Sequence, residues 1–231
     1  MNEAVKNRLI SSNPCQFVEL PHKQRYESTF YSAEQLKALF DAIQGDELYP
    51  LIKITALFGL RRSEALGLKW DSIDFEANRL TIKHTVARIT RTVEKDRTKN
   101  KSSHRSFPLT SEAVALFRAA LAAERENRRL FGKEYHENSY VFKWSDGRPF
   151  SPDYVSSHFA LLLKKNGLPH IRFHELRHSC ASLLLNNGCT LKDVQEYMGH
   201  SDIQMTANIY GHLDTARKQA LTESIAASLS V

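Results

Sequence analysis

Residues 51–60 form an apolar run that directly follows Pro50 and contains Lys53 as its one charged residue. Proline suits the first turn of a helix, because its fixed φ matches the helix and its missing N–H would have had no partner there. A helix this apolar has no polar face to turn toward water. The run therefore predicts a helix buried at the centre of the fold, with Arg61 carried to its end.

Helical periodicity also dominates the chain outside this run. One helix is expected to start at Ser32, whose hydroxyl can cap it while the Gln35 side chain returns the second bond of a capping box. Gly188 and Gly199 stand where left-handed residues commonly end helices. The other helical segments are residues 112–129, 153–165, 174–187, 191–198 and 215–229.

One interval between the helical segments is patterned for β-strands. Residues 79–83 alternate, residues 86–93 continue with β-branched side chains, and residues 105–108 are expected to close a small antiparallel sheet. A polar tract, residues 95–104, lies between the last two predicted strands. The predicted fold class is therefore mainly α with a small antiparallel β-sheet (α+β).

The composition favours a folded protein with a polyanionic partner. Of the 231 residues 42% are hydrophobic, which suffices for an ordinary core, and the formal net charge of +6 arises from 32 Lys and Arg spread along the chain. The three cysteines lack the paired close spacing of a zinc site. Since the sequence shows neither a signal peptide nor an apolar run of membrane-spanning length, we expect a cytoplasmic protein with reduced thiols and no membrane partner.

A cluster of basic side chains opens the segment 174–187. His174, Arg177 and His178 lie three and four residues apart, so they share one face of a helix that begins near Phe173. A guanidinium beside an imidazole can bind the non-bridging oxygens of a phosphate. A solvated basic helix face is the structural alternative.

The same cluster also fits the zinc-protease pattern H-E-x-x-H, with His174 and His178 as ligands and Glu175 as general base. This interpretation needs a third ligand, for which Glu196 or His200 is available. It is disfavoured because the neighbouring Arg177 would repel Zn²⁺ and because it gives no role to Arg61 or Tyr210.

Four segments together carry a more specific pattern. In their order and spacing they resemble the catalytic domain of the tyrosine recombinases, the phage integrase family that includes conjugative-transposon integrases. The resemblance extends from about residue 31 to residue 213 and implies the fold of DNA breaking-rejoining enzymes. The four segments are Gly-Leu-Arg-Arg-Ser-Glu at 59–64, His-Glu-Leu-Arg-His at 174–178, Met-Gly-His at 198–200 and Asn-Ile-Tyr at 208–210.

The resemblance implies roles for the first two of these segments. Arg61 would be the first phosphate clamp, and Glu64 its supporting carboxylate. His174 and Arg177 would belong to the active site, and His178 would be a structural neighbour. Two arginines from distant parts of the chain would then meet at one phosphate.

The remaining segments imply the other catalytic groups. His200 would hydrogen-bond the phosphate, and Tyr210 would be the nucleophile. The tract 99–105 resembles the β-hairpin that carries the family's catalytic lysine, and its position favours Lys99 as general acid. The family's usual threonine after this lysine is Asn100 here, and Lys101 is the alternative acid.

These roles define a phosphoryl transfer. A phenol with a pKa of about 10 is a poor nucleophile at neutral pH, so His174 or a phosphate oxygen would take the proton of Tyr210 as it attacks. Arg61 and Arg177 would neutralise charge on the phosphorus. Lys99 would protonate the departing 5′ oxygen and leave a 3′-phosphotyrosine. The scheme requires no metal and no cofactor.

The spacing of the last two candidates imposes a condition. If Ser201 caps a straight helix that runs to Tyr210, the phenol lies roughly 13 Å of axial rise beyond the helix start. His200 and Tyr210 would then not meet. Residues 206–209 are therefore expected to bend or move.

The expected protein is a site-specific DNA recombinase that acts on double-stranded DNA with other protomers in a synaptic complex. Residues 1–29 would be a linker from a missing upstream core-binding domain, and residues 30–213 the catalytic domain. Residues 214–231 would form a helix that docks on a neighbouring protomer or packs on its own domain. The alternatives are a catalytically inactive DNA-binding module of the same fold and a type IB topoisomerase.

Overall fold

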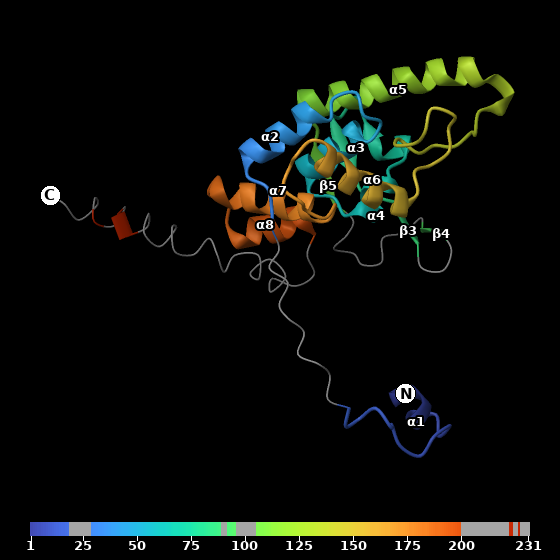
Figure 1. The fold of residues 1–231 in the computed structure, drawn as a ribbon, viewed down its shortest axis with the longest axis vertical. Coiled ribbons are helices and arrows are strands. Elements are labelled where there is room, and N and C mark those ends of the chain that lie inside the picture. Colours follow the sequence, from blue (N-terminus) through green and yellow to red (C-terminus); the bar gives the residue numbers. More distant parts are fainter. Residues whose placement is uncertain (19–28, 89–91, 96–104, 200–221, 224–225, 227–231) are drawn as a thin grey trace.

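The computed structural model describes residues 1–18, 29–88, 92–95, 105–199, 222–223 and 226. Helices predominate in this part and are accompanied by small antiparallel sheets (Figure 1), so the predicted fold class is confirmed. The helices are α1 (Asn2–Lys6), α2 (Ala33–Ala42), α3 (Tyr49–Phe58), α4 (Arg62–Leu66), α5 (Ser111–Phe131), α6 (Pro152–Lys165), α7 (Glu175–Asn186) and α8 (Leu191–Met198).

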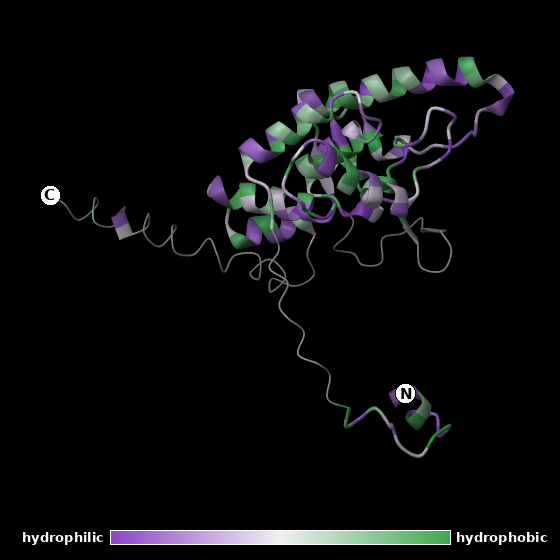
Figure 2. Cartoon of the chain, in the orientation of Figure 1, coloured by the Kyte–Doolittle hydropathy of each residue, from purple (hydrophilic) through white to green (hydrophobic). Residues whose placement is uncertain are grey.

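Helix α3 lies in the core, as its apolar run predicts. It has Pro50 in its first turn and buries Leu51, Ile52 and Ile54 completely. It packs against α4, α5 and α7, and Figure 2 shows hydrophobic residues gathered where these helices meet. Gly59 ends the helix in the left-handed conformation, with φ of +57°. A Cβ at Gly59 would stand 2.6 Å from the sulfur of Met198, so α8 approaches this turn closely.

Side-chain caps explain why the predicted helix starts are accurate. Ser32 and Gln35 form the expected capping box, with Gln35 N donating to Ser32 Oγ at 3.3 Å and Ser32 N donating to Gln35 Oε1 at 2.9 Å. Hydroxyls also cap α5, α6 and α8, from Thr110, Ser151 and Thr190. A cap satisfies N–H groups that have no partner inside the helix, and so fixes where the helix begins.

The strands differ from the predicted arrangement. A three-stranded sheet has the order β1 (Ile73–Asp74), β2 (Arg79–Thr81) and β5 (Ser106–Pro108), while β3 (Thr85–Arg88) and β4 (Thr92–Lys95) pair separately. The prediction of one strand over residues 86–93 was wrong, because the antiparallel pairing of Arg88 with Thr92 divides that stretch into two strands of a hairpin. Strand β1 was missed because two residues are too short to show alternation.

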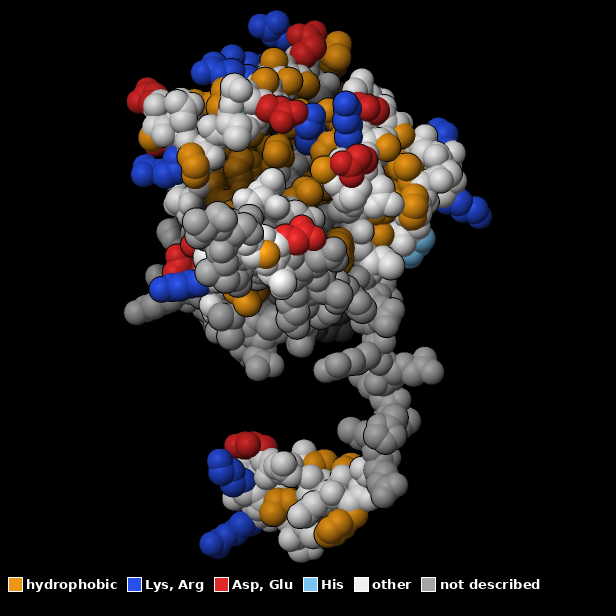
Figure 3. Space-filling view, turned by 90° about the vertical axis from the view of Figure 1, so that its left-hand side faces the viewer, with side chains coloured by type: hydrophobic (Ala, Val, Ile, Leu, Met, Phe, Trp, Pro, Cys, Tyr) orange, Lys and Arg blue, Asp and Glu red, His pale blue; other side chains and the backbone are white. Residues whose placement is uncertain are grey.

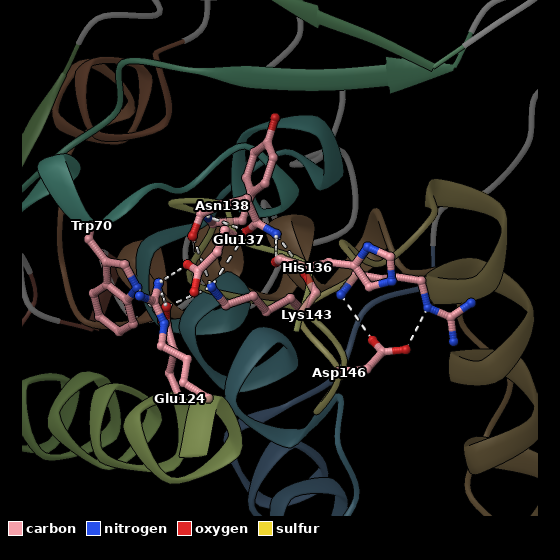
Figure 4. Close-up of polar contacts among 11 residues, drawn as sticks. Trp70, Glu124, His136, Glu137, Asn138, Lys143 and Asp146 are labelled. Atoms are coloured by element: carbon pink, nitrogen blue, oxygen red, sulfur yellow. Dashed lines mark hydrogen bonds and ion pairs between the residues drawn. The ribbon is translucent and has the colours of Figure 1, made fainter. Parts of the chain in front are cut away.

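A buried polar network joins α5 to the loop that follows it (Figure 4). Glu124 is 6% exposed and accepts hydrogen bonds from Trp70 Nε1 at 2.6 Å and from Arg128 at 2.8 Å. Its carboxylate also lies 2.9 Å from the ammonium of Lys143. Burial works to raise the pKa of Glu124, but the bonds from Lys143 and Trp70 hold it below its usual value. The network therefore contains an ionised pair inside the fold.

The molecular surface mixes charges of both signs on the face shown in Figure 3, with apolar side chains exposed between them. The positive formal charge is therefore not displayed there as a uniform basic surface. Among the thiols Cys180 is buried, Cys189 is half-buried and Cys15 is exposed. None of the described helices is both long and apolar enough to cross a membrane.

The structure describes only parts of the predicted linker and of the predicted C-terminal helix. Residues 2–6 of the predicted linker form the short helix α1, which buries none of its residues. Most of the predicted helix over residues 215–229 lies outside the described residues. The proposed division into linker, catalytic domain and C-terminal helix stays a prediction.

Candidate active site

The turn between α3 and α4 positions Arg61. Its backbone N–H donates to Glu64 Oε2 at 2.8 Å, and its Nη1 donates to Glu64 Oε1 at 2.6 Å. The side chain of Arg61 is partly exposed, whereas Glu64 is 1% exposed. The buried carboxylate thus holds the backbone and the guanidinium of Arg61 together, in the place where a supporting carboxylate was expected.

Arg177 is buried between the ends of two helices. It is 1% exposed, and it donates from Nη1 to Gly59 O and from Nη2 to Met198 O, both at 2.5 Å. These carbonyls stand at the C-termini of α3 and α8, where a helix dipole favours a cation. Burial and then the charge of Arg61 lower the pKa of Arg177 to about 9, which leaves it protonated at neutral pH.

The end of α8 contacts both arginines. Arg61 Nη2 donates to Gly199 O at 3.0 Å, one residue beyond the carbonyl that binds Arg177. Gly199 takes the predicted left-handed conformation, with φ of +63°. His200, Lys99 and Tyr210 lie outside the described residues, and their roles stay predictions.

His174 stands at the start of α7, on the surface of the same region. It is exposed, and its ring lies perpendicular to that of His178 with 5.0 Å between ring centroids. Although the residue is exposed, neighbouring atoms partly shield its ring from water; this desolvation, followed by the positive charge of His178 and Arg177, lowers the pKa of His174 below its ordinary value. An imidazole that is neutral at neutral pH can accept a proton.

The helix face that was predicted to carry His174, Arg177 and His178 together is only partly formed. His174 and His178 contact each other, but Arg177 is directed into the core, where helix ends bind it. The difference arises because α7 packs against α3 and α8, which covers the side that carries Arg177.

A groove of about 670 Å³ opens beside Arg61 and His174. It lies between α4, β3, α6 and residues 170–174, and no acidic residue is among the described residues that line it. Arg62 is anchored on one wall by Pro152 O at 3.1 Å and by the hydroxyl of Ser156. A groove with this lining attracts anions. Its basic side chains are Arg61, Arg62, His170, Arg172 and His174.

The zinc interpretation does not fit these contacts. Glu175 is fully buried and binds Arg172 through that residue's backbone N–H and through Nη2 at 3.0 Å. It is therefore engaged as a structural group and not free to act as a general base. Among the described residues no group of three His, Cys, Asp or Glu side chains is arranged to hold a metal.

Sequence reasoning missed Arg105, which binds the same carboxylate as Arg61. Its Nη1 lies 3.1 Å from Glu64 Oε1, and its Nη2 lies 2.9 Å from Glu64 Oε2. A signal was present, since strand alternation places Arg105 on the same face as the apolar Phe107. A charged residue on the buried face of a strand indicates a partner inside the fold.

Comparison with known proteins decides the family. The model of the phage integrase family matches residues 29–217. The chain belongs to the phage integrase family. The resemblance drawn from its four segments is thereby confirmed.

Two curated relatives show which members of the phage integrase family the chain resembles. It is 31% identical to a tyrosine recombinase XerC-like protein of Caldanaerobacter subterraneus subsp. tengcongensis, over 97% of this chain and 62% of the relative. It is 25% identical to the ICEBs1 integrase of Bacillus subtilis, over 96% of this chain and 61% of the relative. The chain thus spans about three fifths of the length of these relatives.

Solved structures of the family share the fold. The Tn1549 transposon integrase, solved in complex with transposon right end DNA, matches with a TM-score of 0.75 and 26% identity, over 94% of this chain and 73% of that one. The XerA recombinase matches with a TM-score of 0.64 over 89% of this chain. The fold is therefore that of tyrosine recombinase catalytic domains.

Proposed function

We propose that this chain is the catalytic part of a site-specific DNA recombinase that cleaves and rejoins strands through Tyr210. The observation that carries the proposal is the pairing of Arg61 and Arg177 around the buried carboxylate of Glu64. Together with Arg105, these two guanidiniums share one negative charge, and the excess positive charge borders a basic groove. Such a site suits a phosphodiester, whose charge increases toward the transition state.

The cleavage step uses the predicted groups in named roles. The phenolic oxygen of Tyr210 attacks phosphorus, and its proton passes to neutral His174. Arg61, Arg177 and a hydrogen bond from His200 stabilise the charge on the non-bridging oxygens. The bond from phosphorus to the 5′ oxygen breaks, and Lys99 gives that oxygen a proton. The products are a 3′-phosphotyrosine and a 5′-hydroxyl, with no oxidant or hydrolytic water consumed.

The rejoining step reverses these transfers. A 5′-hydroxyl from a partner strand gives its proton to Lys99 and attacks the phosphotyrosine, and Tyr210 leaves with the proton held by His174. The ester conserves the bond that hydrolysis would lose, so ligation needs no cofactor. Strand exchange requires two cleaved duplexes, so the partners are double-stranded DNA and other protomers. The DNA complex of the related Tn1549 integrase supports this choice of partner.

The proposed function also assigns the segments of the chain. Residues 30–213 carry catalysis, residues 1–29 link them to an upstream DNA-binding domain, and residues 214–231 dock on a neighbouring protomer. The coverage of about three fifths of the curated relatives supports an additional domain in the whole protein. Since its substrate is DNA, we place the reaction in the cytoplasm.

A strand-joining assay tests the proposal. The chain is incubated in EDTA with two duplexes that carry the ends of a candidate mobile element, one radiolabelled and one longer and unlabelled. Recombination transfers the label to a product of new length, and Tyr210→Phe abolishes the transfer. A parallel incubation contains supercoiled plasmid, and its relaxation without joined product in the first incubation would instead favour a topoisomerase. DNA binding without cleavage would favour an inactive module.

A further inference from the structure

Arg105 is a charged residue whose side chain is buried next to the small sheet. It directly precedes β5, and its carbonyl accepts a hydrogen bond from Ile82 N at 2.9 Å. Its side chain is 8% exposed, and its guanidinium carbon lies 5.3 Å from the centroid of the Phe107 ring. Backbone pairing and ring contact therefore hold Arg105 in a fixed place.

Both terminal nitrogens of Arg105 bind Glu64, at 3.1 and 2.9 Å. The same carboxylate accepts from the side chain and the backbone N–H of Arg61, and its Oε2 lies 3.9 Å from Arg177 Nη1. A two-pronged pair of this kind fixes both the position and the rotation of a carboxylate. Arg105 therefore sets the orientation of the Glu64 carboxylate, to which Arg61 is hydrogen-bonded.

The charges at this point do not balance. Burial raises the pKa of Glu64, but Arg105 first, and then Arg61 and Arg177, lower it to about 2. One ionised carboxylate thus faces three guanidiniums. Because Arg105 already engages both oxygens of Glu64, less of its negative charge is left to offset Arg61 and Arg177.

Stability alone does not explain the arrangement. The buried Nε of Arg105 has no hydrogen-bond partner in the part of the chain that the structure describes. A buried donor without a partner lowers the stability of the fold. Replacing buried ion clusters by apolar side chains is often neutral or stabilising. An apolar residue beside Phe107 would serve a purely structural purpose better.

We propose that Arg105 is a positioning residue for the phosphate-binding arginines. It holds Glu64 in place and satisfies its charge, so that Arg61 and Arg177 present their guanidiniums to the phosphate with the correct geometry and an excess of positive charge. This inference rests on the proposed recombinase function. It assigns Arg105 no contact with the substrate.

The test compares Arg105→Met, Arg105→Lys, Glu64→Gln and the double variant Glu64→Gln with Arg105→Met. Arg79→Met is the matched control, because Arg79 is an exposed residue of the neighbouring strand β2 and pairs with Asp74 at 3.8 Å. Each variant is tested for the rate of covalent protein–DNA adduct formation on nicked duplexes at saturating concentration. A second substrate has a bridging 5′ sulfur, which leaves as a thiolate without a proton donor.

We expect Arg105→Met to slow adduct formation roughly tenfold to a hundredfold on both substrates, with little change in DNA affinity, because a small misplacement of binding groups is costly at the transition state. Arg105→Lys should restore part of the rate, since it keeps the charge but lacks the planar fork. The double variant should be no slower than Glu64→Gln, because both changes break one interaction. Arg79→Met should react at the wild-type rate.

Three results would overturn the proposal. The first is a wild-type rate of adduct formation in Arg105→Met. The second is recovery of the Arg105→Met rate on the sulfur substrate, because this would show that Arg105 acts with the acid that protonates the leaving group. The third is a rate loss in the double variant equal to the sum of the two single losses. If Arg105→Met does not fold, Arg105→Lys and the sulfur substrate still distinguish these outcomes.

A measurement without DNA separates this proposal from the proposed function. Glu64 has a lowered pKa, so it contributes stability that is present above its unfolded pKa and is lost as pH falls toward about 2. Loss of Arg105 should raise the folded pKa of Glu64, so that the acid decline is smaller and ends at a higher pH in urea unfolding at pH 2–5. An adduct-free wild type would reject the recombinase function alone, whereas an unchanged acid profile in Arg105→Met would reject the role of Arg105.

Discussion

At the residue scale, the site depends on buried charge that is neutralised by backbone and side-chain groups together. Arg177 has almost no access to solvent, yet it remains ionised because two helix C-termini and Glu64 surround it. The same contacts fix the guanidinium before any substrate arrives. Preorganised charge of this kind stabilises a transition state without the energy of reorganising solvent.

Replacing Arg177 should therefore affect stability and catalysis together. We expect Arg177→Met to lower the free energy of unfolding by about 3–5 kcal/mol, because it leaves the carbonyls of Gly59 and Met198 without their buried donor and removes one of the guanidiniums around Glu64. Below the melting temperature of the variant, adduct formation should fall on the order of 10²-fold to 10³-fold. Chemical unfolding and adduct rates measure the two effects. Arg129→Met, at an exposed position of α5, is the control and should change neither.

The lowered pKa of His174 should be visible in how the free energy of unfolding depends on pH. Its pKa is lowered in the folded state, so its contribution is complete above the unfolded pKa of about 6.5 and is lost as pH falls through the folded value. Wild-type stability should decline between pH 7 and pH 5, and His174→Asn should decline less. Urea unfolding at the two pH values tests this. An equal decline in both proteins would contradict a lowered pKa.

At the element scale, local sequence predicts helices better than it predicts how their ends meet. The capping residues Ser32 and Gln35 and the apolar run of α3 can be read directly, because they act within one turn of the chain. The hairpin of β3 and β4 could not be distinguished from one long strand, since both halves carry β-branched residues. The contact of Arg177 with the ends of α3 and α8 joins residues 59, 177 and 198, which only tertiary packing brings together.

The network around Glu124 makes an element-scale prediction. Glu124→Gln should leave Lys143 without its buried partner and lower the free energy of unfolding by about 3 kcal/mol. The adduct rate should be unchanged, because no member of this network lines the basic groove. Glu126→Gln, at an exposed position of the same helix, should alter stability by no more than about 0.5 kcal/mol. Equal effects of the two changes would show that the network is not a stabilising link.

At the scale of the whole molecule, the candidate site joins distant parts of one chain. Residues 61, 64, 105, 174, 177 and 199 meet where α3, α4, α7, α8 and β5 approach each other. The sequence could indicate Arg61, His174 and Arg177 through the resemblance of its segments. It could not indicate that Arg105 shares Glu64, because that contact exists only after the sheet packs against the α3–α4 turn.

Assembly on DNA is the prediction that belongs to the whole chain. If residues 214–231 dock on a neighbouring protomer, a chain ending at residue 213 should bind DNA but remain one protomer per site, whereas the full chain forms larger complexes. Analytical ultracentrifugation with and without DNA compares the two. Identical association of both chains would instead favour packing of this segment on its own domain.

The covalent intermediate tests the central claim most directly. Nicked duplexes with a randomised sequence around the nick are incubated with the chain in EDTA, and denaturant-resistant adducts are isolated, sequenced and digested for peptide mass spectrometry. The account predicts one modified peptide, with a nucleotide 3′-phosphate on Tyr210, and no adduct with Tyr210→Phe. A phosphate attached to another residue, or an adduct that persists in Tyr210→Phe, would contradict it.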